Sequence, residues 1–493
     1  MAMKLRHSKL LDGLPMRTSG AGAGLGACGW RRIRQVILCA AMVLYLVGCA
    51  TPTVSPELSV RSVSMGDAAA GLEDAQLVGG KGWDWGRSIL CEIDGRCALF
   101  GYGNKSFTES TDFFAIGEGA DGKPAWARTY GGTHRELLSA VAPTLDGGYL
   151  LAGMSQSLFF TSMRVISPSR PPRPIVISID AVGEPRWALT FDAPAVWLFG
   201  AAPTADGGHV LVGFIPGIGL PNPIVAVKLS AKGEVVWGYS YNFGVNAFAA
   251  AAVSTNDGGI AIAGYSSPDH RPAQNALLMK VDDLGAPLWA KLYDTDGRQC
   301  ALSIAAMPDS SLVTTGWSVA SSGTQRVYAQ KVSSAGTPMW AFSLEGLRSG
   351  MGRHVILGHR SDMLIAGTMA DGPHGGQDGL AVLLGSDGTP KASIVIGGPK
   401  DDEIRAAARL RDGRYRLFGS TESFDAAAVD ALSVVWSPQS IRGETSPGLD
   451  PKPLAIHEMP SEVVRKDLEV RAVRLPLSSI ESTKLIIPTT KKQ

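Results

Sequence analysis

Asp257-Gly-Gly-Ile-Ala-Ile-Ala-Gly264, followed shortly by Ala276-Leu-Leu-Met-Lys-Val-Asp-Asp-Leu-Gly-Ala-Pro-Leu-Trp289, is the stretch that decides the fold. The Asp side chain can hydrogen-bond the backbone two residues further on, and the glycines allow the positive φ that a tight turn requires. The residues after each turn are apolar without alternation, which is typical of strands buried on both faces. The stretch therefore predicts two tight turns, each next to a short buried strand.

This stretch is repeated along the chain with a regular period. The glycine that closes the first strand recurs every 51 or 52 residues, with one step of 60, at Gly101, Gly153, Gly213, Gly264, Gly316, Gly367 and Gly419. An Asp stands seven residues before it in every copy except the sixth, which has Arg360. The second turn repeats independently, with a Trp four residues after its glycine in five copies and Ala392 in the sixth. Two separate markers thus define seven units.

Units of about fifty residues with four short apolar segments are typical of propeller blades. We predict an all-β fold, a seven-bladed β-propeller of four-stranded antiparallel blades. The repeated Trp is expected to pack between neighbouring blades. No fourth strand follows Asp430–Trp436 in the last unit, whereas Asp74–Gly80 precedes the first unit in the register of an outer strand. The ring is therefore expected to be closed by this N-terminal strand, which removes two free sheet edges.

These repeats, from about Asp74 to Trp436, resemble bacterial extracytoplasmic seven-bladed β-propeller proteins of the DGG…G…W type. The resemblance implies a secreted or lipid-anchored protein, and many members of this class have no assigned activity. The Asp282-x-x-Gly285-x-x-x-Trp289 turn is also similar to turns of quinoprotein dehydrogenases and of the lipoprotein of the outer-membrane β-barrel assembly machinery. Those rings have eight shorter blades, so we interpret the likeness as a shared turn.

The N-terminus has the pattern of an export signal. Arginines at 31, 32 and 34 precede the apolar run Val36–Val47, which is short for a membrane span. Leu46-Val-Gly-Cys49 resembles a lipobox, which implies acylation of Cys49, with palmitate for example, and an extracytoplasmic chain. Ala50 in place of Asp implies sorting to the outer membrane of a Gram-negative bacterium. The predicted organisation is a signal peptide at 1–48, a lipidated tether at 49–72, the propeller at 73–440 and a Pro-rich, partly disordered extension at 441–493.

Charge and cysteine content agree with this compartment. The formal net charge is +1, which gives no basic excess for nucleic acid. Cys91 and Cys97 flank the Asp94-Gly95 turn and are a disulfide candidate, either directly opposite or diagonal on the hairpin. Cys300 is expected to be a buried small apolar residue. In the C-terminal extension only Asp467–Leu475 alternates like a strand, and it is expected to dock on a sheet edge.

No set of residues in the sequence forms a recognisable catalytic or cofactor site. His354, His359, His374 and Asp378 are close in sequence, but the hairpin is expected to separate them, so no metal site is predicted. Three inner strands that are otherwise apolar carry an arginine expected to face the central channel: Arg87, Arg353 and Arg405. They predict either the wall of a water-filled channel or an anion or carboxylate site at the ring centre. An aromatic residue follows the strand glycine in four units: Tyr102, Phe214, Tyr265 and Trp317. These side chains are expected either to pack in the core or to form an aromatic rim that holds a sugar.

One blade is longer than the others. The 60-residue step comes from the stretch Leu158–Arg173, whose candidate binding residues are Leu158, Phe159, Phe160, Arg164, Arg170 and Arg173. Insertions in repeat proteins often form the binding face. An apolar centre with a cationic rim fits a protein surface or anionic glycolipid head groups better than a neutral sugar. The sequence therefore predicts a monomeric envelope propeller that binds or scaffolds an envelope protein. Glycan or small-ligand binding at the channel mouth is the alternative, and a hydrolase or quinoprotein-type enzyme is the third.

Overall fold

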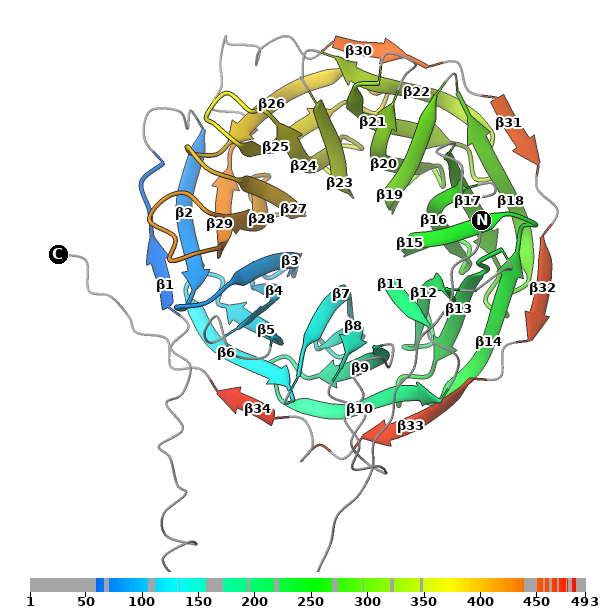
Figure 1. The fold of residues 1–493 in the computed structure, drawn as a ribbon, viewed down its shortest axis with the longest axis horizontal. Coiled ribbons are helices and arrows are strands. Elements are labelled where there is room, and N and C mark those ends of the chain that lie inside the picture. Colours follow the sequence, from blue (N-terminus) through cyan, green and yellow to red (C-terminus); the bar gives the residue numbers. More distant parts are fainter. Residues whose placement is uncertain are drawn as a thin grey trace, which may run out of the picture. The chain divides into compact units, whose positions relative to one another are not determined.

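The computed structural model describes residues 59–65, 71–104, 111–132, 134–156, 172–192, 196–216, 221–267, 274–295, 297–319, 323–345, 349–438, 450–454, 457–460, 463–467, 470–475, 477 and 481–484. These residues form antiparallel β-sheets and no α-helix, so nothing among them could span a membrane as a helix. Seven sheets form the blades of a seven-bladed β-propeller, which confirms the predicted fold (Figure 1).

Within each blade the strands follow one another from the ring centre outward. Blade 1 contains β3 (Asp84–Cys91), β4 (Cys97–Asn104), β5 (Thr111–Glu118) and β6 (Pro124–Gly131). Blade 2 contains β7 (Glu136–Pro143), β8 (Tyr149–Ser155), β9 (Arg173–Ile179) and β10 (Pro185–Asp192). Blade 3 contains β11 (Trp197–Pro203), β12 (His209–Phe214), β13 (Ile224–Leu229) and β14 (Val235–Asn242).

The remaining blades repeat this arrangement. Blade 4 contains β15 (Asn246–Ser254), β16 (Ile260–Ser267), β17 (Asn275–Val281) and β18 (Pro287–Asp294). Blade 5 contains β19 (Arg298–Ala306), β20 (Leu312–Val319), β21 (Gln325–Val332) and β22 (Pro338–Glu345). Blade 6 contains β23 (Ser349–Leu357), β24 (Met363–Ala370), β25 (Gln377–Leu384) and β26 (Pro390–Ile396). Blade 7 contains β27 (Asp402–Arg409), β28 (Tyr415–Thr421) and β29 (Asp430–Trp436).

In the six repeats that have it, the Asp holds the first turn. Asp206 Oδ1 accepts a hydrogen bond from the Gly208 N–H at 3.1 Å, and Gly207 has φ of 81°. Such a φ is easy only for glycine, which explains the residue pattern of the turn. A lysine from the third strand adds an ion pair in three blades: Lys228 with Asp206, Lys280 with Asp257 and Lys331 with Asp309.

The repeated Trp connects one blade to the next. The Trp187 indole donates a hydrogen bond to Ala231 O of the following blade at 3.2 Å. A Cβ at Gly233 would lie 2.9 Å from that indole, so the second-turn glycine leaves room for the ring. In three blades the residue four positions after the Trp is a Tyr whose hydroxyl donates to the glycine carbonyl of the next blade: Tyr130, Tyr241 and Tyr293. The Trp set thus packs between blades.

Seven hydrophobic clusters lie between the seven pairs of neighbouring blades. The cluster around Phe418 joins blade 7 to blade 1, and the one around Leu417 joins blade 6 to blade 7. Because every blade shares a cluster with each neighbour, the ring is continuous. A salt bridge of 2.6 Å between the buried side chains of Glu118 and Arg416 adds a polar contact between blades 1 and 7.

An N-terminal strand completes blade 7, as the sequence predicts. β2 (Leu72–Gly79) pairs antiparallel with β29, and its Leu77 and Val78 are buried on opposite faces of the blade. The stretch 49–72 was predicted to be a tether throughout. Within it the structure places β1 (Ser59–Ser62), which pairs with β2 as a fifth strand. Arg61 contacts the buried Asp430 at 3.0 Å, so the fold begins earlier than predicted.

The C-terminal extension covers the outer edges of five blades. Its strands pair in descending blade order with blades 5, 4, 3, 2 and 1: β30 (Asp450–Pro453), β31 (His457–Pro460), β32 (Val464–Asp467), β33 (Arg471–Leu475) and β34 (Glu481–Lys484). Figure 1 shows them following the outer rim of the ring. We call these five strands the belt. The sequence predicted one docking segment, and the difference arises because strands of four or five residues show no clear alternation.

The two cysteines of blade 1 form a disulfide. Cys91 and Cys97 are direct partners in the register of β3 and β4, with Cα atoms 4.0 Å apart. Of the two arrangements left open by the sequence, the structure has the directly opposite one. Cys300 is free and buried, and burial raises the pKa of its thiol well above the ordinary value.

Candidate functional site

Each inner strand carries a β-bulge at the same place. In the pairing between the inner strand and the second strand, one residue of the inner strand has no partner. It directly follows the inner-strand residue that pairs with the strand glycine. The skipped residues in blades 1 to 7 are Arg87, Ser139, Phe199, Ala250, Leu302, Arg353 and Arg405. Bulges redirect side chains and are common next to active sites. Because the blades repeat, these seven residues occupy equivalent depths around the channel.

The three predicted channel arginines occupy this one position in adjacent blades. Blade 7 lies between blades 6 and 1, so Arg405 has Arg353 on one side and Arg87 on the other. Burial and the charge of Arg405 lower the pKa of Arg87 below its ordinary value. The same causes lower the pKa of Arg353 to about 10. The structure thus brings Arg87, Arg353 and Arg405 into one electrostatically coupled group, which we call the arginine cluster.

The arginine cluster is only partly neutralised. Glu403, two residues before Arg405 on β27, forms an ion pair with it at 2.5 Å. Arg353 Nε is buried and has no hydrogen-bond partner among the described residues. An unpaired buried donor costs free energy unless something accepts its hydrogen bond. The cluster therefore keeps a positive charge and at least one unused donor.

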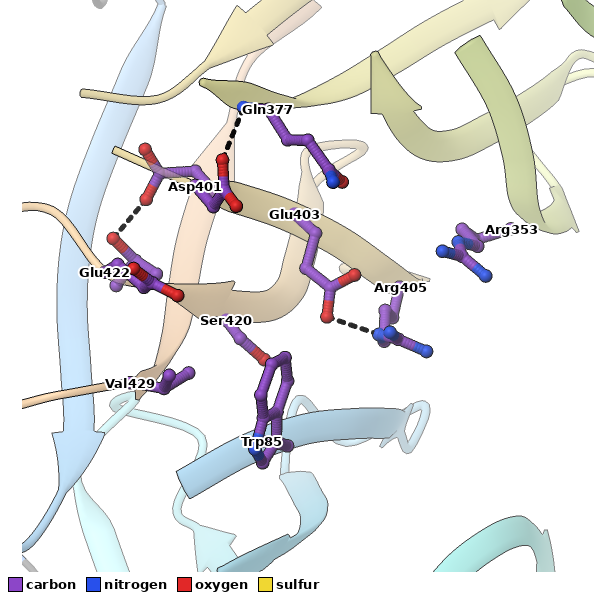
Figure 2. Close-up of a pocket in the computed structure, with 11 residues that line it drawn as sticks. Trp85, Arg353, Gln377, Asp401, Glu403, Arg405, Ser420, Glu422 and Val429 are labelled. Atoms are coloured by element: carbon purple, nitrogen blue, oxygen red, sulfur yellow. Dashed lines mark hydrogen bonds and ion pairs between the residues drawn. The ribbon is translucent and has the colours of Figure 1, made fainter. Parts of the chain in front are cut away.

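A cavity of about 230 Å³ opens beside the arginine cluster (Figure 2). It is lined by Trp85, Arg353, Gln377, Asp401, Asp402, Glu403, Arg405, Ser420, Thr421, Glu422 and Val429. Figure 2 shows Arg353 and Arg405 at one end and Asp401 and Glu422 at the other, with Glu403 and Trp85 between them. The cavity is thus basic toward the arginines and acidic toward the opposite rim.

Most of the polar groups in the cavity wall already hold the turns of blade 7. Asp401 Oδ1 accepts from the Gln377 N–H at 2.9 Å, and Asp402 accepts from the Gly398 N–H at 2.6 Å. The Thr421 hydroxyl donates to Asp402, and the Ser420 hydroxyl accepts from the Gly86 N–H of blade 1 at 3.1 Å. Among the described residues, neither hydroxyl has a hydrogen bond to a histidine or lysine that could activate it as a nucleophile. The hydroxyl groups of Thr421 and Ser420 thus hold blade 7 and its contact with blade 1.

Three residues near the channel are not indicated as functional by the sequence pattern. Glu403 and Trp85 stand two residues before the bulge residue, and Phe199 is the bulge residue of blade 3. Aligning the seven inner strands on the bulge position would have revealed them. The predicted aromatic set Tyr102, Phe214, Tyr265 and Trp317 lies on the second strands, directly opposite Trp85, Trp197, Phe248 and Cys300.

The other predicted residues lie elsewhere. Leu158, Phe159, Phe160, Arg164 and Arg170 fall outside the described residues, as does Cys49. Arg173 begins β9 and lies 3.9 Å from Asp192.

The histidines of blade 6 are separated. His354 is packed between blades 6 and 7, where its Nδ1 accepts from the Ala407 N–H at 3.1 Å. The backbone N–H of His374 donates to Asp378 at 3.0 Å. No group of three or more metal-ligating side chains occurs in the described part of the chain.

Comparison with known proteins yields only fold likenesses. No family model and no curated protein matches the sequence. A polysaccharide lyase, Uly1, aligns at 9% identity and a TM-score of 0.42, covering 79% of this chain and 94% of its own. A glucose dehydrogenase aligns at 14% identity with a TM-score of 0.36, and the alignment covers 60% of this chain and 95% of the dehydrogenase. The gluconolactonase XC5397 of Xanthomonas campestris aligns at 12% identity with a TM-score of 0.34, and the alignment covers 78% of this chain and 96% of the gluconolactonase. These likenesses carry no argument about activity.

Proposed function

We propose that this protein is an exported, lipid-anchored binding propeller that captures a carboxylate-bearing ligand at the mouth of its channel. The observation that carries the proposal is the arginine cluster, three guanidinium groups at one structural position of three adjacent blades. A planar guanidinium matches a carboxylate in geometry and charge. The other four blades place uncharged residues at that position, so the positive charge is confined to one side of the channel.

The electrostatics of the site support this role. Each guanidinium of the cluster disfavours the charge of its neighbours, which contributes to the lowered pKa values of Arg87 and Arg353. A bound carboxylate would offset that repulsion and accept the unused hydrogen bond of Arg353 Nε. Clustering like charges has no advantage for stability, so a ligand that compensates them is the physical explanation we favour.

Thermal unfolding with simple carboxylates tests the proposal. Malonate and citrate, compared with chloride at equal ionic strength, should raise the melting temperature of the wild-type chain, because a ligand that binds only the folded state stabilises it by mass action. The double variant Arg353→Met/Arg405→Met should lose this response. Arg414→Met is the matched control, since Arg414 pairs with Asp412 in the first turn of blade 7, and it should keep the response. An equal response in both variants would refute the proposal.

Membrane anchoring is the second part of the proposal and rests on the sequence around Cys49. Cys49→Ser should abolish incorporation of a labelled fatty acid and release the protein from the membrane fraction. A wild-type protein that takes up no label would refute the lipid anchor. The wild type and the variant are compared in the same host with the same leader.

Binding of an envelope protein through Leu158–Arg173 stays a prediction, because most of these residues lie outside the described part of the chain. The insertion lies between β8 and β9. Gly153 of β8 pairs with Ile175 of β9, and this pair lies next to the bulge of blade 2. Replacing 157–171 by a short Gly-Asn turn should abolish crosslinking to such a partner without changing the carboxylate response. Recovery of the same crosslinked partners would refute the protein-binding role of this loop.

A further inference from the structure

Five aromatic side chains form a continuous stack on blades 3 and 4. Phe199 and Phe214 are parallel, with ring centroids 5.7 Å apart, and Trp197 lies 5.8 Å from Phe214. Phe214 meets Phe248 edge to face at 4.7 Å, and Phe248 stacks on Tyr265 at 4.8 Å. We call these five residues the aromatic wall. The stack crosses the boundary between two blades, so it belongs to neither blade alone.

The aromatic wall is accessible to solvent, unlike the aromatic core of the blades. Trp197 is 36% exposed, whereas core rings such as Phe100 are 0% exposed. The other four members of the wall are half-buried, and none belongs to a buried cluster between blades. A set of partly exposed aromatic rings at a channel mouth is typical of ligand sites rather than of packing alone.

The register places the aromatic wall at the depth of the arginine cluster. Trp197 and Phe248 occupy the position of Glu403, two residues before the bulge, and Phe199 occupies the position of Arg405 itself. In a ring of seven, blades 3 and 4 are the two farthest from blade 7. Figure 1 accordingly shows β11 and β15 across the channel from β27. One side of the mouth is therefore cationic and the opposite side is aromatic.

From this arrangement we propose that the ligand is an acidic oligosaccharide, a short chain that contains uronic acid, lying across the channel mouth. The inference rests on the proposed carboxylate site and names its ligand class. Apolar C–H faces of sugar rings pack on aromatic rings, and the carboxylate of a uronate pairs with guanidinium groups. Sheets packed face to face lie about 10 Å apart, which makes a ring of seven inner strands about 20 Å across. A single sugar cannot reach both walls, and a short chain can.

The carboxylates of the cavity favour a sugar over a simple polyanion. Asp401 and Glu422 lie at the end of the cavity away from the arginines, where they would repel an anion that has no hydroxyl groups (Figure 2). Carboxylate oxygens accept hydrogen bonds from hydroxyl groups, which an oligosaccharide supplies at every ring. A ligand with scattered carboxylates and many hydroxyls satisfies both ends of the cavity.

Calorimetric titration with α-1,4-linked tri-galacturonate tests the inference, with maltotriose as the neutral trisaccharide and malonate as the simple carboxylate. The wild type should bind tri-galacturonate more tightly than either. Trp197→Leu, which removes the ring from an exposed position, should weaken the affinity for tri-galacturonate about five- to tenfold. It should leave malonate binding unchanged. Trp197→Tyr keeps an aromatic ring and should stay within about twofold of the wild type. The double variant Arg353→Met/Arg405→Met should weaken the binding of both tri-galacturonate and malonate.

The outcomes separate this inference from the proposed function. If malonate binds in an arginine-dependent manner but tri-galacturonate binds no better, the carboxylate site stands and the oligosaccharide is refuted. Equal affinity for maltotriose and tri-galacturonate would refute the acidic class. Loss of tri-galacturonate affinity in Trp197→Tyr as large as in Trp197→Leu would refute the stacking role. If neither anion binds the wild type, both proposals fall together.

Discussion

Single side chains at the blade boundaries carry much of the specificity of this ring. His354 belongs to blade 6, and its Nδ1 accepts a hydrogen bond from the backbone of Ala407 in blade 7. Burial lowers the pKa of His354 to about 4, since an imidazolium between two blades would be desolvated. A neutral ring is required for the hydrogen bond, because the protonated ring has no acceptor. The contact therefore makes the stability of the ring sensitive to acid.

The consequence for pH follows from linkage. An unfolded histidine has a pKa near 6.5, so the unfolded chain binds a proton that the folded chain excludes between pH 6.5 and 4. The contribution of neutral His354 to the free energy of unfolding is present above about pH 6.5. It is lost as the pH falls toward 4, by up to about 3 kcal/mol. His354→Asn keeps an acceptor that does not titrate. We expect the urea midpoint of the wild type to fall relative to that of this variant between pH 7 and 4.5.

His359→Asn is the control for that measurement, because His359 is exposed in the turn of the same blade. It should follow the wild-type pH profile. Parallel profiles of the wild type and His354→Asn would show that His354 does not cause the acid sensitivity.

At the scale of strands, the N-terminal pair β1 and β2 contributes unequally to blade 7. β2 buries Leu77 and Val78 in two different clusters and pairs along β29. β1 adds pairing to β2 but places only the partly buried Val60 against a cluster. Both strands cover an edge, but only β2 fills the core. Closure of the ring therefore depends on β2.

Two truncations measure this difference. A chain that starts at Gly71 lacks β1 and should lose about 2 kcal/mol, since it gives up edge hydrogen bonds, the contact of Arg61 with Asp430 and the partly buried Val63 and Met65. A chain that starts at Lys81 also lacks β2 and should lose about 5 kcal/mol or more, because two large side chains and a full strand pairing disappear. Urea unfolding gives both values. Similar losses in the two chains would place the closure elsewhere.

At the scale of the whole ring, the belt connects blades that are far apart in sequence. Its half-buried apolar residues pack at the outer ends of four boundaries between blades: Leu454, Val463, Val470 and Leu475. Arg465 lies over the Tyr239 ring at 4.4 Å, and Arg474 lies over Trp187 at 5.3 Å. The belt also pairs with the outer strands of blades 1 to 5, which would otherwise present unpaired backbone groups. It therefore both seals the boundaries and protects five sheet edges from self-association.

Removal of the belt should expose those edges. A chain that ends at Ser437 is expected to remain a propeller, because its blade clusters are intact, but to self-associate in light-scattering chromatography. A chain that ends at Lys484 keeps all five belt strands and should behave like the full chain. A strictly monomeric chain ending at Ser437, at the same concentration, would contradict the protective role.

The sequence by itself determined the number of blades, their turns and the closing strand. These features depend on short-range chemistry. Asp257 and its five counterparts, the positive-φ glycines and the apolar runs recur from unit to unit, so every copy indicates the same local structure. Only the tertiary structure decided that Arg87, Arg353 and Arg405 meet, because residues far apart in the chain become neighbours only when the ring closes.

The aromatic wall and the belt likewise required the structure. Phe199 and Arg405 look unrelated in sequence, and a bulge shared by every inner strand makes them equivalent. The belt strands have four or five residues and little alternation, so their pairing is set by the open edges of the blades they cover. Local patterns specified the blades, whereas long-range pairing and ring geometry decided the site and the cover.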